Sequence, residues 1–230
     1  MKTKSESLFE KYCKSVGYTC VPIPVGTRQG RTPDYRVCYG DDKIIVEIKE
    51  LSPSIEDKRR ARELKKQGWT LGVEQPGKRI YDEIRRSAGQ LKRFANCTLP
   101  CVLVLYDNIV VDGVRLGVSQ LMQPALIDFG MYGLQTETLS VPSSDYPDMD
   151  IRVTANGRGG KRQMTPDSRV YVSAVSVLCE GQNGEEPYLY SFHNWFANIP
   201  LSRHLFRSAR DLHFAKPDHP DKCPQKWVEI

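Results

Sequence analysis

The chain has 230 residues, enough for one substantial hydrophobic core, so a single domain spanning residues 1–230 is expected. A hydrophobic content of 40% and a charged content of 27% are those of an ordinary globular protein and exclude an intrinsically disordered chain. No apolar run reaches the ~18 residues needed to cross a bilayer, and the first residues contain no apolar segment of the secretory kind. We therefore expect a cytoplasmic protein without a membrane partner.

Basic residues exceed acidic ones, with 33 Lys and Arg against 28 Asp and Glu, which gives a net charge of +5. So small an excess is compatible with a nucleic-acid partner but does not establish one. Most of the surplus lies in residues 58–66, 78–93 and 156–162. A solvated surface explains any one of these segments equally well, whereas the three together favour a polyanionic partner.

Seven cysteines are scattered through the sequence, an odd number that does not suggest a disulfide framework. Reduced, partly buried thiols are the better interpretation. A structural zinc site is the weaker alternative, because zinc sites usually show paired short spacings and the sequence has no CxxC pair. The candidate zinc ligands are Cys97 and Cys101, or His213, His219 and Cys223.

The first predicted element is a helix that begins after Thr3 and runs to Tyr18. Thr3 and Glu6 have the spacing of a capping box, in which each side chain accepts a hydrogen bond from the other residue's backbone N–H. Glu10 lies outside the apolar stripe of this helix. Gly17 and the prolines at 22 and 24 predict that a loop follows. The stripe itself is predicted from helical spacing to contain Leu8, Phe9, Tyr12, Cys13 and Val16.

Residues 32–51 predict a β-hairpin with Gly40 and Asp41 at its turn. Tyr39 then faces Asp42, and because paired numbers sum to 81, Asp34 lies directly opposite Glu47. Directly opposed side chains share a face, with Cβ atoms about 4.5–5.5 Å apart, and strand alternation puts Lys49 on that face too. Asp41 and Asp42 belong to the turn. The other face is almost wholly apolar and is predicted to face the core, with Tyr35, Val37, Tyr39, Ile44, Val46 and Ile48.

Two helical segments are expected after the hairpin. Residues 55–67 are highly charged and predict either a helix or a mobile arm. Residues 79–95 predict a stronger helix, because apolar residues recur on one face. Arg79, Arg86 and Arg93 form a second stripe roughly opposite, with Gln90 beside it. The apolar face contains Ile80, Ile84, Ala88, Leu91 and Ala95.

The remaining elements are expected to be mainly strands. Residues 100–108 form a near-continuous apolar run, as in a strand buried on both faces. Residues 123–133 predict a short element, and residues 140–168, rich in Pro, Ser, Asp and Gly, a long loop or insertion. Residues 169–230 predict strands and a tail: a strand at 169–180, its hairpin partner at 188–194, and an irregular to helical end over the last thirty residues. This order predicts an α/β fold, a mixed β-sheet flanked by helices with extra C-terminal strands.

Asp34, Glu47 and Lys49 together suit a metal-dependent hydrolytic site. Two carboxylates at this separation can share one hard cation, since Mg²⁺ takes oxygen ligands and keeps several waters. A bound cation lowers the pKa of its water and neutralises charge on a phosphoryl oxygen, and a lysine on the same face can orient the water or stabilise the transition state. The alternative is an exposed polar face with a cross-strand salt bridge.

Pro33-Asp34 followed by Glu47-Ile48-Lys49 resembles the motif of the PD-(D/E)xK nuclease superfamily, which has the restriction-endonuclease-like fold. The letters alone are weakly specific, because the sequence contains five Pro-Asp dipeptides and four (D/E)xK triplets, and only this combination falls on two paired strands. The resemblance covers residues 1–110. It implies Mg²⁺- or Mn²⁺-dependent hydrolysis of DNA or, less often, RNA. It also implies a further acid from the preceding helix, Glu10, and a catalytic glutamine from the following helix, Gln90.

We therefore expect a metal-dependent endonuclease that acts on DNA in preference to RNA, with Asp34, Glu47 and Glu10 as metal ligands. The resemblance to this superfamily suggests a role in defence or restriction. Many of its members form dimers, so a homodimer is possible. Contacts to backbone phosphates, which carry no sequence readout, are expected from Arg79, Arg86, Arg93, Lys58, Arg59 and Arg62.

Other functions stay open from the sequence. One is a catalytically inactive nucleic-acid-binding module with the same fold, and another is an interaction subunit whose contact surface is the C-terminal half. A nuclease or acyl-transfer site based on His193 or His204 is a weaker alternative, because an isolated histidine after a strand is more often structural. The sequence has no GxSxG, P-loop or GxGxxG motif to support other hydrolase, NTPase or dinucleotide-binding functions.

Overall fold

A mixed sheet of eight strands forms the centre of the protein, in the order β1-β2-β3-β4-β9-β10-β11-β12. Helices flank it, so the predicted α/β class is confirmed at that level. This computed structural model describes residues 2–24, 32–67, 78–94, 98–111, 114–115, 127, 131–132, 139–142, 150–153, 164–181, 184–216 and 227–230.

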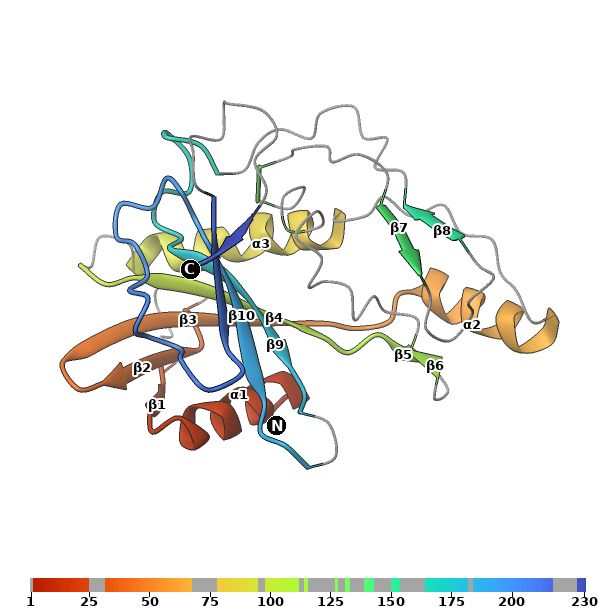
Figure 1. Ribbon diagram of the computed structural model, residues 1–230, viewed down its shortest axis with the longest axis horizontal. Helices are drawn as coiled ribbons and strands as arrows, with labels where there is room; N and C mark the ends of the chain where they lie inside the picture. Colours follow the sequence, from red (N-terminus) through yellow and green to blue (C-terminus); the bar gives the residue numbers. More distant parts are fainter. Residues whose placement is uncertain are drawn as a thin grey trace.

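Helices α1 (Lys4–Ser15) and α3 (Lys78–Phe94) cover opposite faces of the sheet (Figure 1). On one face, Phe9 and Tyr12 of α1 pack into a buried cluster with Val37 and Val46 of the hairpin. On the other face, the apolar side of α3 packs over the centre of the sheet in a second buried cluster. Helix α2 (Ile55–Gln67) extends away from the sheet beyond the end of β3 (Figure 1).

The first helix begins as the sequence predicts. Thr3 and Glu6 form the capping box, with each side chain bonded to the other residue's backbone N–H. The helix ends at Ser15 rather than at Tyr18, because Gly17 has a left-handed φ of 77° that turns the chain back. The chain then forms strand β1 (Thr19–Pro22), which the sequence analysis took for a loop, paired antiparallel with β2.

Strands β2 (Tyr35–Tyr39) and β3 (Asp42–Leu51) form the predicted hairpin in the predicted register, with Tyr39 paired to Asp42. Gly40 at the turn has a φ of 57°, which a residue with a Cβ rarely adopts. The predicted core face is buried except for Tyr39, which is 47% exposed at the turn. On the opposite face of β3, Ile45, Glu47 and Leu51 are buried, and α3 packs over this face.

Strand β4 (Cys101–Asp107) lies parallel to β3 and is buried along its whole length, as the apolar run predicts. Parallel neighbours need a long crossover, and here it contains α2 and α3. The charged segment at 55–67 is therefore a helix, and the helix predicted at 79–95 is confirmed with bounds one residue earlier. Strand β9 (Ala174–Cys179) follows in the sheet, also parallel.

The C-terminal region adds more strands than the sequence predicts. Strand β9 starts five residues later than expected, after a turn in which Arg169 has a positive φ of 54°, and pairs antiparallel with β10 (Tyr188–His193) as predicted. The last thirty residues were expected to be irregular to helical, and this was wrong for two segments. Strands β11 (Leu212–Ala215) and β12 (Val228–Glu229) extend the sheet beyond β10.

Two small two-stranded sheets lie outside the main sheet. One joins β5 (Val110–Val111) and β6 (Val114–Arg115). The other joins β7 (Leu139–Pro142) and β8 (Asp150–Val153), within the segment predicted as a loop or insertion. Within the described ranges, no helix has the length and apolar character needed to span a membrane. The cysteines at 13, 20, 38, 101 and 179 are free thiols, as expected, whereas Cys97 and Cys223 lie outside the described residues.

Candidate active site

Asp34 lies immediately before β2 and is fixed by two hydrogen bonds to β3. Its backbone N–H donates to the carbonyl of Val46 at 3.1 Å, which continues the hairpin ladder. Its carboxylate Oδ2 accepts a hydrogen bond from the N–H of Ile48 at 2.7 Å. The register therefore brings Asp34 to the level of Glu47, as the sequence predicts.

Glu47 is the most deeply buried acid of the site, with 0% of its surface exposed. It lies on the face of β3 covered by α3 and pairs across the sheet with Leu103 of β4. Among the described residues, neither carboxylate oxygen has a hydrogen-bond partner of normal geometry. The ammonium of Lys49 forms an ion pair with Oε1.

The pKa values of both carboxyl groups lie above their ordinary values. Burial raises the pKa of Glu47 to about 7, and the charge of Asp34 adds to this rise, while the ammonium of Lys49 opposes it. Burial also raises the pKa of Asp34, opposed by the hydrogen bond from Ile48 and by the charge of Lys49.

Lys49 completes the trio that the sequence predicts. Its side chain is 26% exposed, whereas that of its partner Glu47 is fully buried. Asp34 is also only partly buried, so Glu47 is the one fully buried member of the three. Solvent therefore reaches the site at Lys49 and Asp34.

Glu10 is not brought to this pair. Its carboxylate accepts a hydrogen bond from the Tyr35 hydroxyl at 2.9 Å and pairs with the Lys2 ammonium at 2.7 Å. The hydrogen bond from Lys2 is the main reason that the pKa of Glu10 lies below its usual value. Glu10 belongs to α1, which packs on the face of the sheet opposite to α3 and Glu47. The structure thus separates Glu10 from the two acids with which the sequence analysis grouped it.

Gln90 lies close to the site, on the buried side of α3. Its side-chain Nε2 donates to the carbonyl of Thr32 at 3.3 Å. Thr32 is two residues before Asp34 and, by continuation of the register, opposite Lys49. Gln90 therefore connects α3 to the segment that positions Asp34, which agrees with the placement expected from the sequence.

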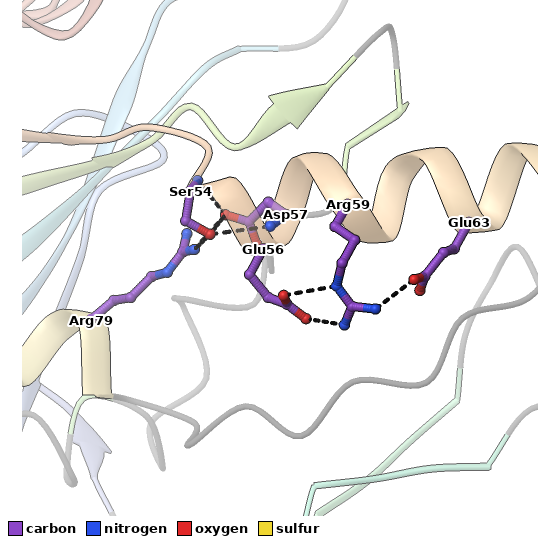
Figure 2. A network of polar contacts seen from close by, with 6 residues as sticks. All are labelled: Ser54, Glu56, Asp57, Arg59, Glu63 and Arg79. Atoms are coloured by element: carbon purple, nitrogen blue, oxygen red, sulfur yellow. Dashed lines mark hydrogen bonds and ion pairs between the residues drawn. The ribbon is translucent and has the colours of Figure 1, made fainter.

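Arg79 is held within the protein by the start of α2 (Figure 2). Its guanidinium donates to the Ser54 hydroxyl at 3.0 Å and forms an ion pair with Asp57. Ser54 and Asp57 also bond to each other in both directions, as in a capping box at the first turn of α2. Arg79 thus ties α3 to α2 and is not displayed on an open surface, in contrast to the phosphate contact expected from the sequence.

The other predicted phosphate contacts differ in their surroundings. Arg59 bridges Glu56 and Glu63 along α2 (Figure 2). Arg86 pairs with Glu83 on the exposed side of α3, and Lys58 and Arg62 are exposed on α2. The backbone of Arg93 lies in α3, but its side chain is outside the described residues, as is the basic loop at 156–162.

The residues present fit a hard divalent cation with two protein ligands. Both carboxylate oxygens of Glu47 are buried, have no hydrogen-bond partner among the described residues, and are metal ligands of the kind that Mg²⁺ prefers. Within the described part of the chain, no group of three or more His, Cys, Asp or Glu side chains is placed to hold a metal ion. Protein sites for Mg²⁺ often have one or two carboxylates, with waters and substrate phosphates as the other ligands.

Comparisons of the chain with protein-family models, with curated proteins and with solved structures found no match. Sequence reasoning missed two features of the site. The N–H of Ile48 is a backbone group and has no sequence signal. Glu47 is completely buried because α3 packs over it. In the sequence, the feature that could indicate this burial is the apolar face predicted for residues 79–95.

Proposed function

We propose that this protein is a divalent-metal-dependent nuclease that hydrolyses phosphodiester bonds in DNA. The observation that carries the proposal is the carboxylate of Glu47, which is fully buried beside Asp34 and Lys49 and has no normal hydrogen-bond partner among the residues that the structure describes. A buried carboxylate without hydrogen bonds lowers the stability of the folded protein, unless a bound ligand such as a metal ion pairs with its charge. Perturbed buried acids next to a partly exposed lysine are a recurrent feature of catalytic sites.

Asp34 and Glu47 would hold the metal ion, Mg²⁺ or Mn²⁺. When bound, such an ion supplies a water of lowered pKa and neutralises charge on the phosphoryl oxygen. The hydrogen bond from Ile48 orients Asp34, so one ligand is positioned before the ion arrives. Glu10 is assigned no metal contact in this proposal, because its oxygens already bind Tyr35 and Lys2.

Lys49 has the position to act on the scissile phosphate. Its side chain is partly exposed, and a metal ion bound to Glu47 would release the ammonium from its ion pair with that acid. It can then donate a hydrogen bond to the attacking water or to a phosphoryl oxygen that gains charge in the transition state. Gln90 supports the chain segment before Asp34 and acts as a positioning residue.

A restriction-endonuclease-like core is part of the same proposal. A hairpin with the acids, a following parallel strand and helices on both faces are compatible with it. The exposed side chains of Lys58 and Arg62 on α2 are the best placed of the predicted phosphate contacts. Such contacts bind the backbone without reading sequence.

Cleavage of supercoiled plasmid with Mg²⁺ or Mn²⁺ tests the proposal. Asp34→Asn, Glu47→Gln and Lys49→Ala should each lower the rate by about a hundredfold or more. The matched controls are Asp41→Asn and Lys43→Ala, which alter the other (D/E)xK triplet at the exposed hairpin turn and should leave the rate unchanged. Equal cleavage by the native protein and the Asp34 and Lys49 variants would sink the assignment.

A nucleic-acid-binding module without catalysis is the second candidate. The separation of Glu10 from the two acids favours it, because only two carboxylates remain for the metal ion. It predicts salt-dependent binding of DNA with no cleavage under any divalent cation. Binding measured at low salt alongside the cleavage assay therefore distinguishes the two functions.

A further inference from the structure

A second group of reactive side chains lies at the turn end of the β2-β3 hairpin. Ser202 Oγ is 2.7 Å from Nδ1 of His204, and Nε2 of His204 is 2.7 Å from Oδ2 of Asp42. Asp42 is the first residue of β3, whereas Ser202 and His204 lie in the connection between β10 and β11. The fold thus assembles a serine, a histidine and a carboxylate in series.

The partner of Nε2 fixes the tautomer of the neutral His204 ring. A carboxylate only accepts, so Nε2 carries the proton that is donated to Asp42, and the neutral ring then presents the lone pair of Nδ1 to Ser202. The Ser202 hydroxyl therefore donates to the imidazole. In the familiar Ser-His-Asp triad Nε2 faces the serine; here the two ring nitrogens have exchanged places, but their roles are the same.

Packing holds the backbone of this segment in place. Leu201, Leu205 and Phe206, on either side of the reactive residues, are each at most 2% exposed. The N–H of Phe206 donates to the Tyr18 hydroxyl at 2.7 Å, and the Tyr18 ring packs against that of Tyr39 at a centroid distance of 4.8 Å. The reactive groups are thus anchored to the hairpin rather than carried on a free loop.

The turn also offers donors for an oxyanion. The carbonyl of Ser202 accepts from the N–H of Leu205 at 3.2 Å, which closes the turn. The N–H groups of Arg203 and His204, inside that turn, have no acceptor within the described residues. The N–H of the residue after a nucleophilic serine is the usual first donor to the oxyanion of an acyl-transfer reaction.

We propose that Ser202, His204 and Asp42 form a nucleophilic site that hydrolyses small carboxylic esters with good leaving groups. The His204 side chain is 59% exposed and that of Asp42 48%, so the site is open to small substrates from solvent. Solvent also weakens the polarising effect of the carboxylate. The site therefore requires an ester that is already activated.

The reaction follows from the proton positions. Ser202 Oγ attacks the carbonyl carbon while its proton moves to Nδ1 of His204, and the bond to the leaving oxygen breaks to give an acyl-serine. The proton on Nδ1 passes to the leaving group or to solvent. Water then attacks the acyl-serine, with Nδ1 as the base, and releases the acid and the free hydroxyl. The sum is ester plus water to acid plus alcohol.

The test uses the full chain with p-nitrophenyl acetate. Release of p-nitrophenolate gives the rate, and peptide mapping by mass spectrometry after brief exposure locates the acetyl group. Ser202→Ala and His204→Gln should each lower the rate at least about tenfold. Asp42→Asn should lower kcat with KM unchanged, because Asp42 positions His204 and does not touch the substrate. Ser208→Ala is the matched control in the same segment and should leave the rate unchanged, since within the described part of the chain that hydroxyl contacts only the N–H of Arg210.

An acetyl group on Ser202 of the native protein, together with the loss of rate in Ser202→Ala, supports the proposal. A native protein acetylated only on lysines, or a Ser202→Ala variant with the native rate, overturns it. Mapping is done on the native protein, so the outcome does not depend on whether a variant folds. Neither measurement involves metal or DNA, so the result is independent of the proposed nuclease function.

Discussion

Oδ2 of Asp34 accepts a hydrogen bond from the N–H of Ile48 at 2.7 Å, and this bond sets the geometry of the acidic site. Ile48 stands between Glu47 and Lys49 in the chain, so the bond ties the Asp34 carboxylate to the peptide that links the other two members. The hairpin register fixes the backbone of Asp34 but does not fix the rotamer of its side chain. With this bond, the β2-β3 hairpin alone positions Asp34, Glu47 and Lys49.

Metal binding should depend on pH through Glu47. The pKa of this buried acid is raised to about 7, so a metal ion has to displace its proton below that pH. We expect the affinity for Mn²⁺ to rise about tenfold per pH unit up to pH 7 and then to level off. Calorimetry in two buffers of different ionisation enthalpy measures the protons released. Binding at about pH 6 without proton release would contradict this assignment, and Asp41→Asn serves as the control variant.

Removal of the Glu47 charge should stabilise the metal-free protein at alkaline pH. The native pKa of about 7 lies above the ordinary value of 4.5, so the native state binds the proton more tightly than the unfolded state does. This contribution to stability is complete below about pH 4.5 and is lost as the pH rises to about 7. Glu47→Gln avoids the loss, so its advantage over the native protein in free energy of unfolding should grow by on the order of 2–3 kcal/mol across that window. Urea unfolding with a chelator present measures it. A difference independent of pH would rule the explanation out.

The hairpin could be predicted from the sequence because its determinants are local. Gly40 suits the left-handed turn, the alternation of apolar residues identifies one core face, and the register follows from the turn. The pairing of Asp34 with Glu47 came from these facts alone. The burial of Glu47 depends on α3, which is far away in the sequence, so an exposed polar face stayed open as the alternative.

Glu10 and the C-terminal strands show where the sequence is insufficient. A helix periodicity locates Glu10 beside the apolar stripe but does not say which face of the sheet the helix covers. The hydroxyl of Tyr35, which binds Glu10, comes from the core face of the hairpin. Strand β12 has only two residues and pairs with β11 across a long separation, so neither strand has a strong local pattern.

Acid should destabilise the protein through a pair of histidines between β10 and β11. Nε2 of His193 lies 2.8 Å from Nδ1 of His213, whose Nε2 donates to the carbonyl of Phe206 at 3.1 Å, so the two facing nitrogens share a single proton. Burial, with the neighbouring His213 and Arg203, lowers the pKa of His193 to about 4. Burial also lowers the pKa of His213, although its hydrogen bond to Phe206 opposes this.

A histidine with a lowered native pKa contributes stability that is complete above about pH 6.5 and is lost as the pH falls towards 4. The free energy of unfolding should therefore fall by roughly 1–3 kcal/mol between about pH 7 and pH 5. His193→Gln should show a shallower fall, because one buried base is removed. Urea unfolding at a series of pH values measures both. Equal slopes for the variant and the native protein would show that other groups cause the acid sensitivity.

Arg79 should matter for stability rather than for DNA affinity. Its guanidinium pairs with Asp57, whose side chain is only 5% exposed, and it joins the first turn of α2 to α3. Arg79→Ala leaves the buried carboxylate with Ser54 alone, which should cost about 1–3 kcal/mol in free energy of unfolding. Arg86→Ala is the matched control: its partner Glu83 lies on the same helix, its own side chain is 63% exposed, and its loss should cost less than about 0.5 kcal/mol. If Arg79→Ala instead leaves the stability unchanged and weakens DNA binding, this prediction is wrong. Arg79 then contacts phosphates, as expected from the sequence.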